Sequence, residues 1–124
     1  MAKKIPEKEK RSHEFRVTVF GSARIKEVDP IYKEIYKLSK DIGKLGVDVV
    51  TGGGPGIMSA ASFGHQAGNK ISKKKSNTIG LNIRLPFEQK ANKSLDLLDN
   101  HDRFSTRLDE FMLLSSMIIV APGG

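Results

Sequence analysis

A glycine-rich loop between two regular hydrophobic patterns places the strongest constraint on the fold of this chain. Residues 47–50 are a short apolar run, residues 51–56 read TGGGPG, and residues 57–63 continue with apolar and small side chains. A short strand that runs through glycines into a helix is typical of β-α units with a parallel sheet. The loop therefore predicts an α/β fold in which the crossovers between strands are right-handed.

The remaining segments continue the alternation of strands and helices. Residues 15–20 (FRVTVF) are rich in β-branched and aromatic side chains and indicate a first strand. Asp29 and Pro30 then provide a cap and a first-turn proline for a helix whose apolar residues recur every three or four positions as far as Gly46. Further elements are predicted as strands at 78–85, near 95–98 and at 117–120, and as a helix at 102–115. We expect a Rossmann-like parallel sheet with helices on both faces, in which 117–120 is a buried strand.

The composition excludes several classes of protein and site. The chain of 124 residues contains no cysteine, which rules out disulfide scaffolds, thiolate zinc sites and cysteine nucleophiles. Its most apolar stretch, residues 111–121, is interrupted by two serines and falls short of the roughly 20 residues that a membrane helix needs. The basic amino terminus is not followed by the apolar segment of a signal peptide. We therefore predict a cytoplasmic protein that makes no contact with a membrane.

Positive charge gathers in two parts of the chain. Lysine and arginine number 21 against 14 aspartates and glutamates, which gives a formal net charge of +7. Residues 1–14 are interpreted as a basic solvated tail and residues 15–124 as the folded domain, while Lys73–Lys75 indicate an exposed loop. Binding of nucleic acid is a weaker interpretation of the charge, because helix-turn-helix and RNP-type signals are absent from the sequence.

Glycines at the ends of two predicted strands are candidate contacts to a ligand. Gly21 and Ser22 follow the first strand, at the carboxyl edge where open α/β sheets bind ligands, although a simple turn is the alternative. The loop after the second strand contains Gly52, Gly53, Gly54 and Gly56. These glycines permit a close backbone approach to a phosphate at the start of the following helix, or they serve a tight turn with positive φ. The loop matches neither a P-loop nor the GxGxxG fingerprint.

Two arginines in the predicted helix at 102–115 are candidate anion ligands. Arg103 and Arg107 lie one helical turn apart and therefore share a face. The guanidinium fork stays charged and binds phosphate or carboxylate with two parallel hydrogen bonds. The alternative interpretation is surface pairing of these arginines with Asp99 or Glu110.

The three histidines give no sign of a catalytic or metal centre. His101 and Asp102 suggest acid/base chemistry, but no serine stands in a recognisable nucleophile elbow. His13 and His65 lack metal-ligand partners at a useful spacing. We predict no metal, and because no lysine lies in a context typical of pyridoxal phosphate, we expect no cofactor.

Five segments in one order resemble a single enzyme family. Between residues 16 and 124 the chain contains VFGSAR, TGGGPGIM, NIRLPFEQ, HDRFSTRLDEF and IIVAPGG. Together they resemble the LOG family, formerly labelled lysine decarboxylase-like, whose members are nucleoside 5′-monophosphate phosphoribohydrolases. The resemblance implies a Rossmann-like, usually dimeric hydrolase, an N-glycosidase that releases a free base and ribose 5-phosphate.

The resemblance also implies roles for individual residues. Arg107 matches the catalytic arginine of the family and would interact with the nucleotide and stabilise the charge shift as the base leaves. The implied substrate-binding residues are Gly21, Ser22, Gly52, Gly53, Gly54, Gly56, Met58, Arg84, Pro122, Gly123 and Gly124. The implied partners are a nucleoside 5′-monophosphate and a second copy of the chain.

Two features depart from the family pattern. Leu108 stands where the family often has lysine. The family loop reads PGGxGTxxE, whereas this sequence ends at PGG and so lacks the catalytic glutamate and the phosphate-binding Gly-Thr pair. We therefore expect the amino-terminal part of a LOG-type domain, truncated after a central strand and impaired as a hydrolase. The alternative is a non-catalytic module that binds a nucleotide or a nucleotide-derived ligand.

Overall fold

The predicted alternation of strands and helices is confirmed in the computed structural model, which describes residues 2–84 and 94–122. Its strands are β1 (Arg16–Phe20), β2 (Asp48–Thr51), β3 (Thr78–Ile83), β4 (Leu97–His101) and β5 (Met117–Val120). Its helices are α1 (Glu7–Arg11), α2 (Pro30–Lys44), α3 (Ile57–Ile71) and α4 (Phe104–Leu114). The strands pair in parallel in the order β4-β3-β2-β1-β5.

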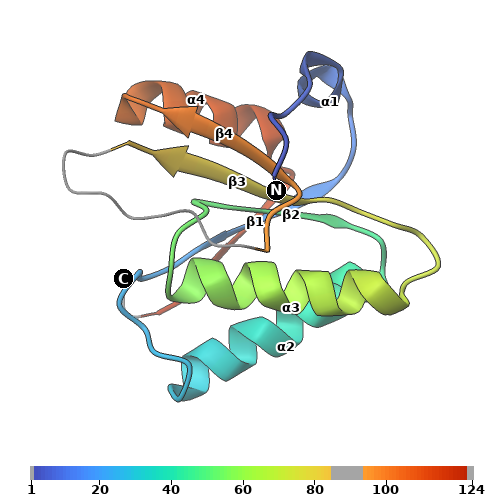
Figure 1. Cartoon of the computed structure of the whole chain (residues 1–124), viewed down its shortest axis with the longest axis vertical. Helices are drawn as coiled ribbons and strands as arrows, with labels where there is room; N and C mark the ends of the chain where they lie inside the picture. Colours follow the sequence, from blue (N-terminus) through green and yellow to red (C-terminus); the bar gives the residue numbers. More distant parts are fainter. Residues whose placement is uncertain (1, 85–93, 123–124) are drawn as a thin grey trace.

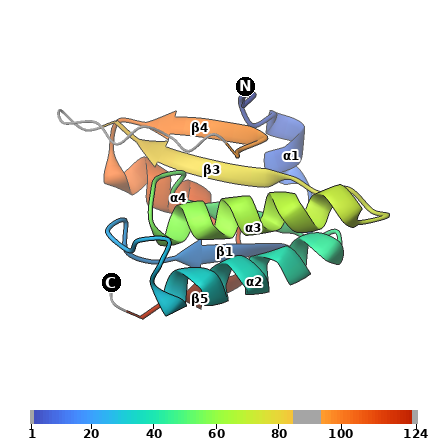
Figure 2. The same ribbon diagram turned by 60° about the horizontal axis from the view of Figure 1, so that its bottom comes forward.

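Helices cover both faces of the sheet, as the sequence predicts. α2 and α3 lie on one face, and α4 and the short α1 lie on the other (Figure 1 and Figure 2). Successive strand residues point to opposite faces, so Val49 packs in the core cluster under α2 and α3, whereas Val50 packs with Phe111 and Leu114 of α4. The sheet is therefore held between two layers of buried apolar side chains.

The boundaries of α2 agree with the capping signals in the sequence. Oδ1 of Asp29 accepts a hydrogen bond from the amide of Ile31 at 2.9 Å, and Pro30 is the first residue of the helix. Beyond the last turn, Gly46 has a φ of +74°, a conformation that glycine adopts without strain. The position of α2 is thus set by local chemistry at both ends.

α2 and α3 pack with their backbones in close contact. Gly64 and Gly68 of α3 face the backbone of Tyr36 and Lys40 in α2, and a Cβ atom at either glycine would collide with the carbonyl oxygen opposite it. Gly43 is the matching small residue on α2 and is buried in the same contact. The absence of side chains at these three positions lets the two helices approach each other beneath the sheet.

β5 differs from the buried strand that the sequence predicts. It pairs with β1 at one edge of the described sheet, and its side chains are largely exposed, with Met117 at 50% and Val120 at 71%. A short apolar run is compatible with an interior or an edge strand, because its sequence does not show what lies beside it. The prediction of a strand here is confirmed, and the prediction of its burial is wrong for the described structure.

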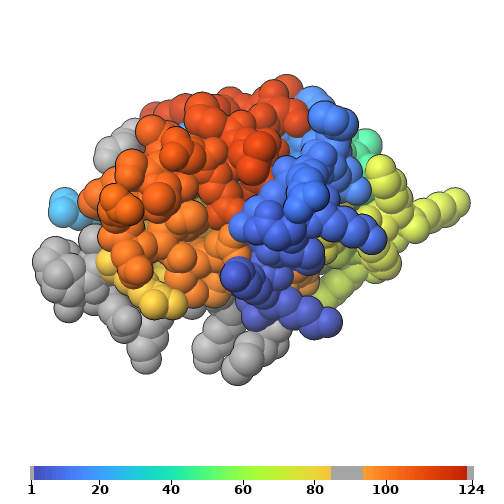
Figure 3. All heavy atoms as spheres, turned by 90° about the horizontal axis from the view of Figure 1, so that it is seen from above, coloured from blue at the N-terminus to red at the C-terminus, as the bar shows by residue number. Residues whose placement is uncertain are grey.

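Part of the amino-terminal segment packs onto the fold, in contrast to the solvated tail that its composition suggests. Ile5 is 2% exposed, and Lys3 forms a β-bridge with the start of β4. Seen from above, the amino-terminal segment (blue) lies against the orange part of the chain that contains β4 and α4 (Figure 3). Charged residues suggest a solvated segment, but Lys10 forms ion pairs with the folded domain. Its ammonium lies 3.1 Å from Asp99 and 3.2 Å from Glu110, both of which are buried.

A buried ion pair joins the amino-terminal ends of β1 and β2. Arg16 is 1% exposed and Asp48 is 4% exposed, and Nε of Arg16 lies 3.4 Å from Oδ2 of Asp48 without the alignment of a hydrogen bond. The carboxylate of Glu9 also contacts Arg16, and the amide of Asn77 donates a hydrogen bond to Oδ1 of Asp48 at 2.7 Å. Burial raises the pKa of Asp48 from 3.8 to about 6.

The raised pKa of Asp48 predicts that this residue contributes less stability as the pH rises. An acid whose pKa is higher in the folded state contributes stability below its unfolded pKa of 3.8, and that contribution is lost as the pH rises through about 6. The loss corresponds to at most about 3 kcal/mol. Urea unfolding at pH 4 and pH 7 should show the Asp48→Asn variant gaining stability relative to the wild type across this interval. A difference between the two proteins that stays constant with pH would contradict the prediction.

Candidate functional site

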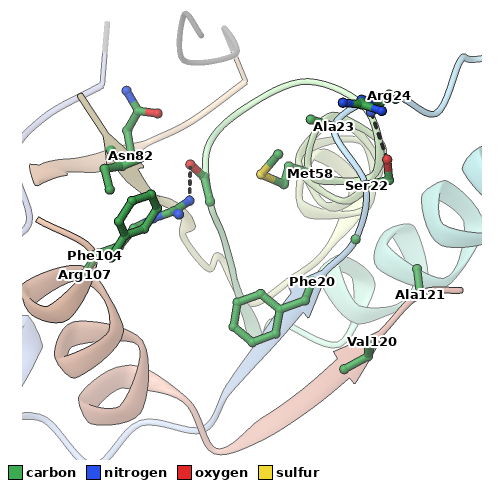
Figure 4. A pocket seen from close by; sticks show the side chains of 13 residues that line it. Phe20, Ser22, Ala23, Arg24, Met58, Asn82, Phe104, Arg107, Val120 and Ala121 are labelled. Atoms are coloured by element: carbon green, nitrogen blue, oxygen red, sulfur yellow. Dashed lines mark hydrogen bonds between the residues drawn. The ribbon is translucent and has the colours of Figure 1, made fainter. Parts of the chain in front are cut away.

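A cavity with a volume of about 700 Å³ lies at the carboxyl edge of the sheet. Its wall is built from residues that end or follow β1, β2, β3 and β5, together with the first turns of α3 and α4 (Figure 4). β1 lies between β2 and β5, so the order of the strands along the chain reverses direction at this point in the sheet. Open α/β sheets bind their ligands at such a point, and the volume is typical of a small-molecule site.

Two glycines allow the loop after β1 to pack against the start of α3. A Cβ atom at Gly21 would lie 2.6 Å from Cβ of Ile57, and one at Gly56 would collide with the backbone of Ser22 and Ala23. Gly56 also has a φ of +70°, which other residues rarely adopt. The amide of Ile57 donates a hydrogen bond to the carbonyl of Ser22 at 3.0 Å. Gly56 therefore serves the turn and its packing, while Gly21 and Ser22 line the cavity.

The glycines directly after β2 have different surroundings. Gly52 lines the cavity, and a Cβ atom there would collide with the guanidinium of Arg107 and lie 2.7 Å from Sδ of Met58. Gly53 has a φ of +78° and faces β3, where a Cβ atom would lie 3.6 Å from Cα of Gly80. Gly52 thus leaves room for the two side chains that share the cavity wall with it.

Arg107 links the ends of β2 and β3 and brings positive charge to the cavity. Its Nε donates a hydrogen bond to the carbonyl of Leu81 at 2.6 Å, and its Nη2 donates one to the carbonyl of Gly52 at 3.3 Å. Its guanidinium lies 5.3 Å from the centre of the Phe111 ring in a cation–π contact. Burial lowers the pKa of Arg107 from its ordinary value, yet a guanidinium remains protonated in proteins. Within the described part of the chain these contacts engage two of its five N–H groups, and the others suit an anion in the cavity.

The sequence analysis does not single out several side chains of the cavity wall. Those with polar or aromatic groups that matter for a ligand include Arg24 after β1, Asn82 in β3 and Phe104 at the start of α4. Phe104 precedes Arg107 by three positions, a spacing that places both on one face of a helix, so the sequence carries a signal for it. Arg103, which was paired with Arg107 by the same kind of spacing, is exposed at the cap of α4 and lies outside the cavity wall.

The predicted substrate-binding residues fall into three groups. Those that line the cavity are Gly21, Ser22, Gly52 and Met58. Those placed outside its lining are Gly53, Gly54, Gly56, Arg84 and Pro122. Gly123 and Gly124 lie outside the described residues. The side chain of Arg84 is exposed, while its amide donates a hydrogen bond to the carbonyl of His101 at 2.8 Å.

The carboxylates considered as surface partners of Arg107 make other contacts. Oε1 of Glu110 lies 2.6 Å from Nε2 of His101, and burial raises the pKa of Glu110. The ligand atoms of Asp99, His101 and Glu110 lie within 4.8 Å of one another, a spacing compatible with a metal ion. The ammonium of Lys10 contacts both carboxylates of this cluster and so fastens the amino-terminal segment to β4 and α4.

The cavity wall combines positive charge with apolar surface. Arg24 and Arg107 line it, and among the described residues no aspartate or glutamate does. Phe20, Met58 and Phe104 add sulfur and aromatic surface between the polar groups (Figure 4). Such a wall suits a ligand that carries an anionic group together with an aromatic or apolar one.

Comparison with known proteins yields one family match and several similar folds. A family model described as the SLOG cluster4 family matches residues 14–124. A search of curated proteins gives no match to the sequence. Similar solved structures include TM1055, with 20% identity and a TM-score of 0.66 over 86% of this chain and 59% of that one. They also include a Moco carrier protein from Chlamydomonas reinhardtii, with 22% identity and a TM-score of 0.68 over 90% and 64% of the two chains.

A molybdenum cofactor binding protein from Rippkaea orientalis is similar to the same degree, with 22% identity and a TM-score of 0.68 over 87% of this chain and 62% of that one. At such identities the likeness concerns the fold alone. The chain spans about three fifths of the length of these structures. Among the described residues, none of the helices combines the length and the apolar character that crossing a membrane requires.

Proposed function

We propose that this chain, which belongs to the SLOG cluster4 family, binds a nucleoside 5′-monophosphate or a related phosphate-bearing ligand. The observation that carries the proposal is the position of Arg107 in a cavity of about 700 Å³ at the carboxyl edge of the sheet. Its guanidinium is held by two backbone carbonyls, so it is oriented before a ligand arrives. An oriented arginine binds a phosphate or a sugar hydroxyl at a lower entropic cost than a mobile one.

The charge of the cavity wall supports an anionic ligand. Arg24 and Arg107 enter the wall from the loop after β1 and from α4, and the described lining residues include no carboxylate that would repel a phosphate. The hydroxyl of Ser22 accepts a hydrogen bond from the amide of Arg24 at 3.1 Å, which orders the loop between them. The wall therefore offers two cationic groups and an ordered turn to the ligand.

A second candidate function is hydrolysis of the N-glycosidic bond, as in the LOG enzymes that the sequence resembles. Arg107 favours it, because this residue matches the catalytic arginine of the family motif and lies in the cavity wall. Departure of the base leaves an oxocarbenium-like sugar that a carboxylate stabilises. Binding is the first candidate, because the described lining residues supply the cationic groups that hold an anionic ligand.

Binding without reaction has a parallel among the similar structures. Two of them are described as a Moco carrier protein and a molybdenum cofactor binding protein. We propose by analogy that a phosphate-bearing, nucleotide-derived compound is an alternative occupant of the same cavity. The cavity would then hold its ligand through Arg107 and Arg24 and release it unchanged.

The experiment that tests the proposal is calorimetric titration of the chain with AMP, GMP, CMP and ribose 5-phosphate. We expect saturable binding of at least one nucleotide, and chromatography of the mixture should show the nucleotide intact. Release of free base would establish hydrolysis in place of simple binding. The absence of binding to all four compounds would contradict the proposed function.

Gly52→Ala should weaken binding without unfolding the chain. The added methyl group falls where the guanidinium of Arg107 and Sδ of Met58 lie, and both are flexible side-chain ends that can move aside. We expect the affinity for AMP to fall by about tenfold or more, since the phosphate ligand loses an oriented guanidinium. The change in the free energy of unfolding should remain near 1 kcal/mol.

A double-mutant cycle checks the cause of that effect. If Gly52→Ala acts by displacing Arg107, it should have little further effect on binding in an Arg107→Ala background. If the losses of binding free energy in the two single variants add up in the double variant, Gly52 acts on the ligand independently of Arg107.

We also propose that the chain forms a homodimer. Leu108, Met112 and Leu113 project from α4 with exposures of 55%, 54% and 61%. Neighbouring exposed apolar side chains of this size are typical of subunit interfaces. Sedimentation equilibrium should yield twice the 13.7 kDa mass of one chain, and a single-chain mass at high concentration would contradict the proposal.

A further inference from the structure

We infer that Phe104 and Asn82 form a subsite for the base of a bound nucleotide, with Phe104 stacking on the ring and the amide of Asn82 contacting its edge. The inference rests on the proposed function and specifies which part of the ligand each side of the cavity contacts. It applies to a purine or a pyrimidine ring, since both present a flat aromatic face.

The exposure of Phe104 is the first observation. Phe104 is 66% exposed although it begins a helix whose other phenylalanine, Phe111, is only 4% exposed. Phe111 packs edge-on against Phe20 with ring centres 5.0 Å apart and belongs to the core on that face of the sheet. Phe104 takes no part in either core cluster and instead lines the cavity. Its ring therefore offers an aromatic surface to a ligand rather than to the fold.

The position of Asn82 is the second observation. Asn82 is half-buried near the carboxyl end of β3 and lines the same cavity as Phe104. Its amide nitrogen donates a hydrogen bond to Oδ1 of Asn100 at 3.2 Å, across the neighbouring strands β3 and β4. This contact orients the amide group. A side-chain amide both donates and accepts hydrogen bonds, as the edge of a base requires.

The arrangement of the cavity separates this subsite from the cationic loop after β1. Figure 4 shows Asn82, Phe104 and Arg107 toward one side of the cavity and Ser22 and Arg24 toward the other. A nucleoside monophosphate placed with its base on Phe104 therefore directs its phosphate toward the loop after β1. Arg107, which lies on the same side as Phe104, then contacts the part of the sugar next to the base.

A single introduced tryptophan reports on stacking directly. The chain contains no tryptophan, so Phe104→Trp creates one fluorophore in the proposed subsite. We expect AMP to quench its fluorescence with saturation, because a stacked purine quenches indole, and ribose 5-phosphate to leave the emission unchanged. Phe63→Trp is the matched control: it makes the same substitution in α3, at a position that is 43% exposed and is part neither of the cavity wall nor of the proposed dimer surface. Its emission should not respond to either compound.

Affinity measurements separate the base from the phosphate. Phe104→Ala should lower the affinity for AMP by about tenfold, the usual effect of removing one stacked aromatic ring, and leave the affinity for ribose 5-phosphate unchanged. Asn82→Ala should alter the ratio of affinities for AMP and CMP, because it removes a hydrogen-bonding group from the edge of the base.

The outcomes distinguish this inference from the proposed function. If the wild-type chain binds none of AMP, GMP, CMP and ribose 5-phosphate, the proposed function is overturned and the subsite with it. The subsite alone is overturned if the wild type binds AMP and ribose 5-phosphate with equal affinity. It is also overturned if Phe104→Ala lowers the affinity for both compounds equally. If Phe104→Ala does not fold, an unquenched Phe104→Trp variant that still binds AMP by calorimetry overturns the subsite independently.

Discussion

Replacement of Gly68 by alanine is expected to lower the free energy of unfolding by about 3 kcal/mol or more. A Cβ atom at this position would collide with the carbonyl oxygen of Lys40, and it would lie 2.9 Å from the amide nitrogen of Lys44. Both obstacles belong to the backbone of α2, which cannot rotate aside as a side chain can. The two helices would have to separate, and the cluster of buried residues between them and the sheet would loosen with them.

A loss of stability in Gly68→Ala is informative, because the helix propensity of alanine alone predicts a gain. In an exposed helix, glycine to alanine stabilises by up to about 1 kcal/mol, so a loss of stability must come from packing. Lys70→Ala is the matched control: it introduces the same residue two positions along α3, at an exposed site, and should change stability by less than about 0.5 kcal/mol. Urea unfolding of both variants makes the comparison. Wild-type stability in Gly68→Ala would mean that α2 and α3 are not in backbone contact.

The contrast between α2 itself and its contact with α3 shows how far the sequence alone predicts the fold. Asp29 and Pro30 are local signals, and they predict the start of the helix correctly. The apolar periodicity predicts the buried face only in part, because Ile35 and Ile42 are buried whereas Leu38 and Leu45 are exposed. The contact through Gly64 and Gly68 depends on which helix lies opposite and at what distance. A contact of this kind joins residues that are far apart in the sequence, so the periodicity of one segment does not predict it. For the same reason, the sequence of residues 117–120 predicts a strand but does not show that this strand lies at the edge of the described sheet.

The sequence predicts residues of the candidate site where a glycine follows a strand or an arginine matches the LOG motifs. Gly52 and Arg107 were selected on those grounds, and the structure places them against each other in one wall. Gly56 was selected by the same reasoning, but its backbone conformation serves the turn. The sequence does not predict Phe104 as a site residue, because an aromatic residue at helical spacing more often belongs to the core. The packing of the fold shows that its side chain is exposed at the cavity.

Loss of Arg107 is expected to have the largest effect on ligand binding. Arg107→Ala removes a guanidinium that faces the cavity, and a hydrogen bond to a charged group contributes about 1.5–3 kcal/mol. We expect the affinity for AMP to fall by about 100-fold, and any turnover of AMP to fall at least as much. The variant also removes two hydrogen bonds from a charged donor to the carbonyls of Leu81 and Gly52, which should lower the free energy of unfolding by about 1–3 kcal/mol.

Arg103→Ala and Arg107→Lys separate the role of the oriented guanidinium from that of positive charge. Arg103 lies on the same helix four positions earlier, is exposed and does not line the cavity, so Arg103→Ala changes the net charge equally and should bind AMP like the wild type. Arg107→Lys retains the charge but cannot donate two parallel hydrogen bonds, so it should recover only part of the loss. Calorimetric titrations of the three variants at one ionic strength give the comparison. Equal losses in Arg103→Ala and Arg107→Ala would mean that net charge alone attracts the ligand, and the oriented arginine would then have no specific role.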